Sequence, residues 1–374
     1  MQKLNRNIFW VLIVSVLFIT SCGDEAEDPG ITLQVPTTYE FARDGATSVD
    51  YSGQTARLDM LAELKAYIGS ANDGTELSEE TLLNMLANEN APFSSAALNE
   101  SGKQLENKTF EADINFFKGV LVDAAAASKA TENASQGQGG LIARGADRMI
   151  LVDDKGWEFT QIVEKGLMGA TFLNQIYNAY LTDAKIGNDV ENTELEEGKN
   201  YTAMEHHWDE AFGYWGVNAQ FDADGENRFL GNYTYGREAY LGSATKLKDA
   251  FLKGRTAIVN KAYDIRDEQK EIIYTEFELI AAATAIHYIN ESIADLSGDD
   301  LGNLFHHASE GYGFAMALKY SPQRSITSDQ LDIILNTGFG TGGDFWEITI
   351  ESLTTAKETI VDAYPDLSDI ADEL

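Results

Sequence analysis

Hydrophobic residues recur every three to four positions along most of this chain, which is the pattern of amphipathic and buried helices. The periodicity predicts helices over residues 52–68, 78–86, 110–130, 157–181, 202–217, 267–296, 301–319, 328–336 and 344–364. An alternating pattern on both sides of Asp44 and Gly45 predicts a small β-hairpin near the N-terminus, the only β structure expected. Residues 218–242 are rich in Gly, Asn and Tyr and are predicted to be irregular. The expected fold class is therefore all-α.

One short motif occurs twice in the predicted helices. Residues 206–214 and 306–314 both read His-His-x-x-Glu, followed by a small residue, an aromatic residue, glycine and another aromatic residue. The two copies hold four of the five histidines of the chain, so a duplication explains them better than chance. We therefore predict two pseudo-repeated helical bundles packed together, a first unit over about residues 52–217 and a second over about residues 243–364.

Each copy of the motif places its polar residues on one face of a helix, because positions i, i+3, i+4 and i+7 lie together. The candidate site residues are His206, His207 and Glu210 in the first copy and His306, His307 and Glu310 in the second. The opposite faces are apolar as well, which predicts buried helices whose carboxylates need a partner. Gly213 and Gly313 lie one turn further on and allow another backbone to approach closely.

A two-fold arrangement of the two units would bring the two polar faces together at one join. The first predicted helix carries Arg57, a candidate charge partner for Glu210 or Glu310. Three interpretations of the cluster remain open from the residues alone. It is a hydrogen-bonded cluster that fixes how the units dock, a site for a divalent metal or iron, or a catalytic site. The zinc-peptidase pattern His-Glu-x-x-His does not occur, so a binding role is favoured over an enzyme.

The first 22 residues have the features of a bacterial lipoprotein signal. Lys3 and Arg6 precede an apolar run, and the sequence Ile-Thr-Ser-Cys ends it at Cys22. The domain organisation expected is a signal peptide over residues 1–21, a lipidated tether over residues 22–38 and a helical domain over residues 39–374. Cys22 is the only cysteine, so the mature chain would contain no disulfide. The lipid anchor predicts attachment to a membrane of the cell envelope, expected to be the outer membrane.

The chain is strongly acidic, with a formal net charge of −34 that becomes −36 when Lys3 and Arg6 are removed with the signal peptide. Such a charge argues against nucleic acid and against anionic membrane surfaces as partners. It suits an acidic, solvated surface outside the cytoplasm.

The spacing His207-x-x-Glu210 and its repeat at His307 resemble the Gly-x-His-x-x-Glu signature of the imelysin family, although Glu205 and Phe305 replace the glycine. A closer resemblance is to an imelysin-like lipoprotein family of uncharacterised function, domain-of-unknown-function family 4856, through residues 51–58 and 205–216. It covers about residues 38–364. The resemblance implies a two-bundle helical fold and an accessory role in metal or iron acquisition, with an outer-membrane iron or metal receptor as a partner. It does not imply a protease.

Overall fold

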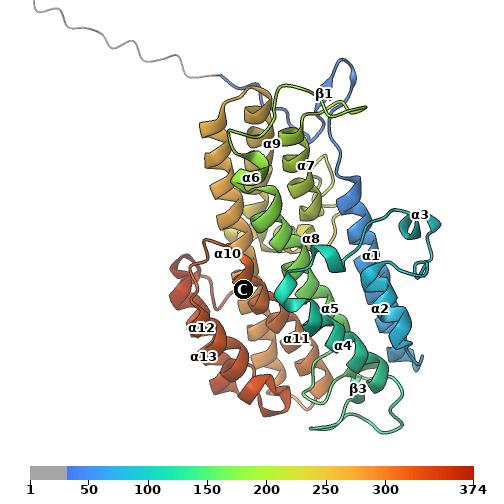
Figure 1. Cartoon of the computed structure of the whole chain (residues 1–374). Coiled ribbons are helices and arrows are strands. Elements are labelled where there is room, and N and C mark those ends of the chain that lie inside the picture. The colour runs from blue at the N-terminus through green and yellow to red at the C-terminus, as the bar shows by residue number, and fades with distance from the viewer. Residues whose placement is uncertain (1–31) are drawn as a thin grey trace, which may run out of the picture. The chain divides into compact units, whose positions relative to one another are not determined.

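Helices dominate the part of the chain that the computed structural model describes, residues 32–374 (Figure 1). The α-helices are α1 (Ser52–Gly69), α2 (Glu79–Ala87), α3 (Ala96–Asn99), α4 (Ile114–Ala127), α5 (Phe159–Leu167), α6 (Asp183–Ile186), α7 (Ala203–Trp215), α8 (Leu230–Leu241), α9 (Ser243–Val259), α10 (Tyr263–Asp295), α11 (Leu301–Ala317), α12 (Ser328–Ile333) and α13 (Ile350–Ala363). The strands are β1 (Ala42–Arg43), β2 (Ala46–Thr47), β3 (Gly140–Arg144) and β4 (Arg148–Val152). The all-α class and the hairpin near the N-terminus are confirmed. The predicted signal peptide and Cys22 lie outside the described residues.

Two local expectations were wrong. The N-terminal hairpin is not the only β structure, because β3 and β4 form a second antiparallel pair that joins Gly140 to Val152. Residues 218–242 are not irregular throughout, because α8 occupies their second half. The composition of α8 is poor for a helix, and its contacts with α9 and α10 compensate for this.

The helix that carries the first motif begins and ends at clear sequence signals. Thr202 accepts a hydrogen bond from the backbone N–H of Glu205, whose carboxylate accepts one in return from the Thr202 backbone. This capping box satisfies two of the free N–H groups of the first turn. Gly216 ends the helix with a φ of 78°, a left-handed conformation that glycine adopts without strain.

The long helix predicted over residues 157–181 is not a regular α-helix. It continues from α5 into two π-helical segments, Met168–Leu173 and Ile176–Tyr180. The wider π turn frees backbone groups for other contacts. One of these contacts is made by the Ala170 carbonyl, which accepts a hydrogen bond from the Phe110 N–H at 2.8 Å.

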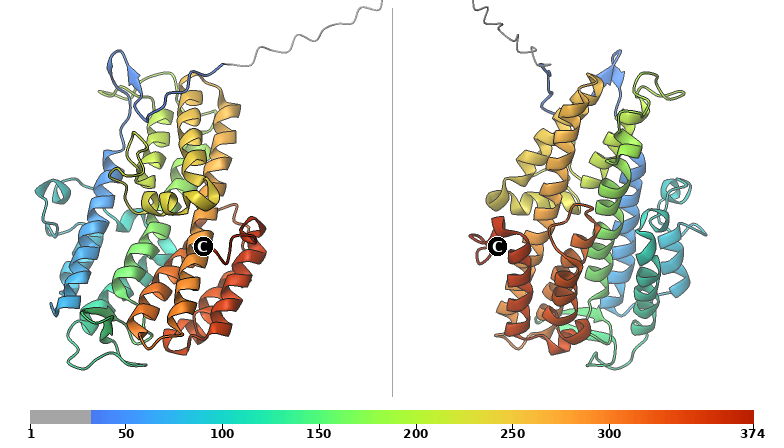
Figure 2. Two further views of the ribbon diagram at one scale, coloured as in Figure 1. Left: turned by 180° about the vertical axis from the view of Figure 1, so that it is seen from behind. Right: turned by 60° about the vertical axis from the view of Figure 1, so that its left-hand side comes forward.

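The two motifs start from opposite ends of the helical bundle. The β1–β2 hairpin lies at one end and the β3–β4 hairpin at the other in Figures 1 and 2. Arg43 of the first hairpin forms an ion pair of 2.7 Å with Glu205, at the start of α7. Gly302, at the start of α11, lies so close to the second hairpin that an added Cβ would be 2.1 Å from the Ala143 carbonyl oxygen. The two polar faces therefore do not meet at one join.

The two motif regions are connected by α1 and by the antiparallel helix that starts at α5 and continues through the two π-helical segments. At one end, Gln54 of α1 donates a hydrogen bond of 3.2 Å to the Tyr180 hydroxyl, beside the first motif. At the other end, Lys65 of α1 pairs with Glu164 of α5 at 2.8 Å, beside the second motif. Lys65 lies eleven positions after Gln54 along α1, and this distance along the helix corresponds to roughly 16 Å. A single ion cannot bridge the two motifs at that separation.

The centre of the bundle is α10, which packs between α9 and α11. By length and composition, α10 is the one helix of the described region that could span a membrane. Most of its apolar stretch is buried inside the protein, as expected for the central helix of a bundle.

Candidate functional site

The first triad consists of His206, His207 and Glu210 on α7. Nδ1 of His207 lies 3.2 Å from one carboxylate oxygen of Glu210, and Nε2 of His206 lies 3.9 Å from the other. Gln54 donates a third contact to Glu210 at 3.1 Å. Burial works against ionisation, but the His207 hydrogen bond, the His206 charge and the Gln54 amide together lower the pKa of Glu210. The Glu210 side chain is half-buried and each of its oxygens has a partner.

A separate buried ion cluster occupies the other side of α7. Arg255 of α9 lies 3.1 Å from Glu205 and donates to Asp209 at 2.8 Å, and all three side chains are at most 1% exposed. Tyr39 adds a hydrogen bond of 2.9 Å to Asp209. Burial raises the pKa of Asp209 to about 6, although Arg255 and Tyr39 oppose the shift. This cluster ties α7 to α9 and to the chain that leads into the first hairpin.

The second triad consists of His306, His307 and Glu310 on α11, and its partners differ from those of the first. His307 contacts Asp295 of α10 at 2.7 Å. Glu310 is buried, as predicted, and pairs with the buried Lys165 of α5 at 3.2 Å. Lys165 also pairs with its neighbour Glu164.

His306 lies between two buried carboxylates. Its Nδ1 is 2.6 Å from Glu158, and its Nε2 is 3.4 Å from Glu310. Burial of Glu158 would raise its pKa, but the hydrogen bond and charge of His306 lower it below its ordinary value. The imidazole of His306 thus lies as a bridge between the carboxylates of Glu158 and Glu310.

A metal ion does not fit the second triad as it is arranged. Lys165 already pairs with Glu310 at 3.2 Å, and its positive charge repels a cation from that carboxylate. In the described region, no group of three His, Cys, Asp or Glu side chains is placed to hold a metal ion. The arrangement resembles the hydrogen-bonded cluster among the three interpretations.

Glycine brings a second element against each triad, as the sequence predicted. A Cβ added to Gly213 would lie 2.6 Å from the Tyr51 Cβ and 2.9 Å from the Gln54 Cβ. A Cβ added to Gly313 would lie 2.4 Å from the Lys165 Cβ. The two copies of the motif therefore pack in the same way. Gly213 allows α1 to approach α7, and Gly313 allows α5 to approach α11.

Arg57 pairs with neither Glu210 nor Glu310 within 4.0 Å among the described residues. It is 5% exposed and donates to the backbone carbonyls of Gly53 at 3.1 Å and Gln104 at 2.8 Å. It is thus a buried cation rather than a surface one.

His306 of the second triad lines a cleft of about 680 Å³. The cleft lies among α1, the β3–β4 hairpin and the start of α5, and its polar lining includes Lys65, Arg144, Arg148, Glu158, Gln161 and His306. The side-chain oxygen of Gln161 is buried without a hydrogen-bond partner among the described residues. A cleft of this size suits a small molecule, and its lining offers both charged groups and hydrogen-bonding groups.

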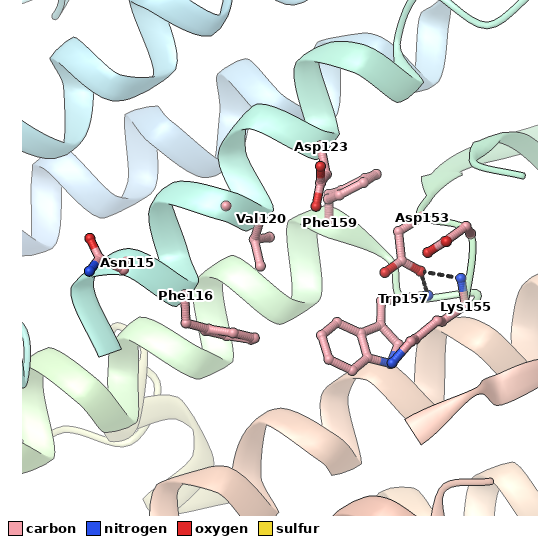
Figure 3. Close-up of a pocket in the computed structure, with 10 residues that line it drawn as sticks. Asn115, Phe116, Val120, Asp123, Asp153, Lys155, Trp157 and Phe159 are labelled. Atoms are coloured by element: carbon pink, nitrogen blue, oxygen red, sulfur yellow. Dashed lines mark hydrogen bonds between the residues drawn. The ribbon is translucent and has the colours of Figure 1, made fainter. Parts of the chain in front are cut away.

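A smaller cleft of about 340 Å³ lies beside α4 (Figure 3). Phe116, Trp157 and Phe159 give it an aromatic wall, and Asp123 and Asp153 line it as well. Burial raises the pKa of Asp153 to about 7, against the backbone hydrogen bonds from Trp157 and Lys155. Near neutral pH this carboxyl changes between a hydrogen-bond donor and a charged acceptor.

Sequence reasoning missed the partners of the second triad, although one signal was available. Glu158, Gln161 and Lys165 stand at i, i+3 and i+7, which is one face of a helix. A polar stripe on an otherwise apolar helix predicts a buried polar contact. Asp295, the partner of His307, carries no comparable signal, because it comes from α10 and reaches the site only through the fold.

One of three comparisons with known proteins finds a match, and that match is to a family model. No curated protein and no solved structure matches it. The link to imelysins stays a prediction. A family model described as Domain of unknown function (DUF4856) matches residues 36–365, nearly the whole of the chain, which therefore belongs to that family.

Proposed function

We propose that this protein is a lipid-anchored binding protein of the cell envelope that captures a small polar ligand in the 680 Å³ cleft beside the second triad. The observation that carries the proposal is the His306 bridge between Glu158 and Glu310 at the wall of that cleft. Holding two carboxylates and an imidazole in one buried cluster is costly, and a site prepared for a ligand justifies such a cost.

The lining of the cleft indicates the chemistry of the ligand. The carboxylate of Glu158 lines the cleft and accepts hydrogen bonds, so the ligand carries hydroxyl or amino donors. Arg144 and Arg148 stand in the same cleft and suit a carboxylate or another acceptor. Amino acids and sugar acids combine both kinds of group.

A bulky side chain on the exposed face of α1 tests the cleft. Ala66 lines the cleft and is exposed, so Ala66→Trp narrows the cleft without disturbing the core. We expect at least one compound from a panel of amino acids, sugars and sugar acids to raise the melting temperature of the wild type, but not that of Ala66→Trp. Ala239→Trp, at an exposed position of α8, is the matched control and keeps the effect. Stabilisation that persists in Ala66→Trp, or no stabilisation by any compound, contradicts the proposal.

The membrane anchor is a separate part of the proposal and rests on the lipoprotein signal that ends at Cys22. Cells fed labelled palmitate should incorporate it into the wild type and not into Cys22→Ala. Equal labelling of both would rule out lipidation at this cysteine.

The first triad supports a second candidate function, binding of a divalent metal or iron. Two imidazole nitrogens there converge on one carboxylate, at 3.2 Å and 3.9 Å. An accessory role beside an outer-membrane iron or metal receptor would then follow. Charge opposes this reading, because Arg57 and Lys108 lie near Glu210 and repel a cation. Zinc that binds the wild type and not Glu210→Gln would favour it.

A further inference from the structure

Four basic side chains lie together beside the first triad without an acidic partner. They are Arg57 of α1, Lys103 and Lys108 of the segment between α3 and α4, and Lys185 of α6. Among the described residues, no carboxylate comes within 4.0 Å of any of them. By contrast, the buried acids elsewhere in the bundle are paired with Arg43, Lys65, Lys165 and Arg255. The chain has 61 acidic and 27 basic residues, so an acidic partner would have been easy to supply.

The contacts of Gly53 show how close two of these cations are. Nζ of Lys103 lies 3.4 Å, and Nη1 of Arg57 3.6 Å, from the point that a Cβ of Gly53 would occupy. The two charged groups are therefore within about 7 Å of each other, close enough to contact one small anion together. Glycine at position 53 leaves the space that the Lys103 side chain uses.

Lys108 and Lys185 complete the group. Nζ of Lys108 lies over the Tyr180 ring, 5.2 Å from its centroid. Burial lowers the pKa of Lys108, and the positive charges of Arg57, Lys185 and Lys103 lower it further, while Glu210 opposes them. The four cations thus act on one another electrostatically, which costs energy unless an anion lies among them.

At the same place, one terminal nitrogen of Arg57 and the buried hydroxyl of Tyr214 have no hydrogen-bond partner among the described residues. Arg57 is 5% exposed, and its guanidinium donates only to two backbone carbonyls through Nε and Nη1, which leaves Nη2 free among the described residues. The hydroxyl of Tyr214, a residue 0% exposed, has no hydrogen-bond partner in the described region and lies close to Arg57. A buried guanidinium without a counter-charge is costly, even when backbone carbonyls accept some of its hydrogen bonds.

We propose that this basic cluster, Arg57, Lys103, Lys108 and Lys185, is a binding site for a small oxyanion of the phosphate or sulfate type. The guanidinium provides paired donors to two oxygens of such an anion, and the lysines provide mobile point charges around it. The acidic surface elsewhere repels anions, so binding is confined to this place. The site does not depend on the cleft at the second triad.

Calorimetric titration of the full-length mature protein with inorganic phosphate and with sulfate, at fixed ionic strength in chloride buffer, tests the site. We expect one anion to bind per chain. The double variant Lys108→Gln, Lys185→Gln should bind it at least about 10-fold more weakly, because two charge-assisted contacts are lost. Arg57 is left in place so that the fold is preserved.

The matched control is Lys129→Gln, Lys253→Gln, which removes two lysines that lie outside the cluster and form no ion pair within residues 32–374. It changes the net charge by the same amount, and its affinity should stay within about 2-fold of the wild type. Equal weakening in both double variants would show a general charge effect and overturn the proposal. If no binding is detected at anion concentrations up to about 10 mM, the Kd is too weak for a binding site, and this result would overturn the proposal as well.

Discussion

Arg255→Met is expected to lower the free energy of unfolding by about 3–5 kcal/mol, the largest effect of any single substitution considered for this chain. The Arg255 side chain is 0% exposed and is the counter-charge of both Glu205 and Asp209. Methionine fills much of the same space but leaves two buried carboxylates with one fewer cation. Within the described part of the chain, Glu205 then retains Arg43, whereas Asp209 retains only the Tyr39 hydroxyl. Urea unfolding followed by tryptophan fluorescence measures the loss.

The pH dependence of this loss identifies its cause. The pKa of Asp209 in the folded protein is about 6, above its ordinary value of 3.8, so the folded state binds the proton more tightly than the unfolded state. The contribution of Asp209 to stability is therefore greatest at low pH and falls as the pH rises from about 4 through about 6. Without Arg255 that pKa rises further, and the deficit of Arg255→Met should be larger at pH 8 than at pH 5. When Arg255→Met is introduced into the Asp209→Asn variant, the deficit in unfolding free energy should no longer depend on pH. A deficit that does not vary with pH would show that lost packing is the cause.

Lys165→Met is expected to cost about 3 kcal/mol of unfolding free energy, while Lys65→Met costs about 1 kcal/mol or less. Both lysines pair with Glu164, which makes them a matched pair. Lys165 is 3% exposed and also pairs with Glu310, whereas the Lys65 side chain is 38% exposed and its charge is screened by water. Urea unfolding of the two variants at the same pH measures the difference.

A second substitution shows whether the unpaired charge causes the loss. In Lys165→Met, Glu310 keeps only His306 and a long contact of 3.4 Å from Tyr233. Adding Glu310→Gln removes the uncompensated charge, so the double variant should recover part of the stability. Equal costs for Lys165→Met and Lys65→Met would contradict a buried ion cluster at the second triad.

The helical fold was predictable because the hydrophobic period extends over many turns and depends little on distant contacts. The N-terminal hairpin was predictable because Asp44 and Gly45 form a turn signal between two alternating runs. The second hairpin has a short apolar run at Ile150–Val152, which a sequence alone does not distinguish from part of a helix. Helix α8 was missed because its stability comes from packing rather than from its composition.

The candidate site was predictable only in part. Periodicity correctly placed each His-His-x-x-Glu motif on one face of a helix and Gly213 and Gly313 at close contacts. It could not show at which end of the bundle each helix begins, and so it led to the wrong expectation of one shared cluster. Spacing within a helix also carries no information about partners from other helices, such as Asp295 for His307. Those partners distinguish a closed hydrogen-bonded cluster from an open metal site.

We propose that the second triad is a hydrogen-bonded cluster at the wall of a ligand cleft rather than a metal centre. Nitrogen NMR of the protein labelled only in its five histidines tests it most directly, with His306→Gln to assign the signals. We predict that one equivalent of zinc at neutral pH leaves the chemical shifts of both His306 ring nitrogens unchanged. A shift of the His306 ring nitrogens at one equivalent of zinc would contradict the proposal.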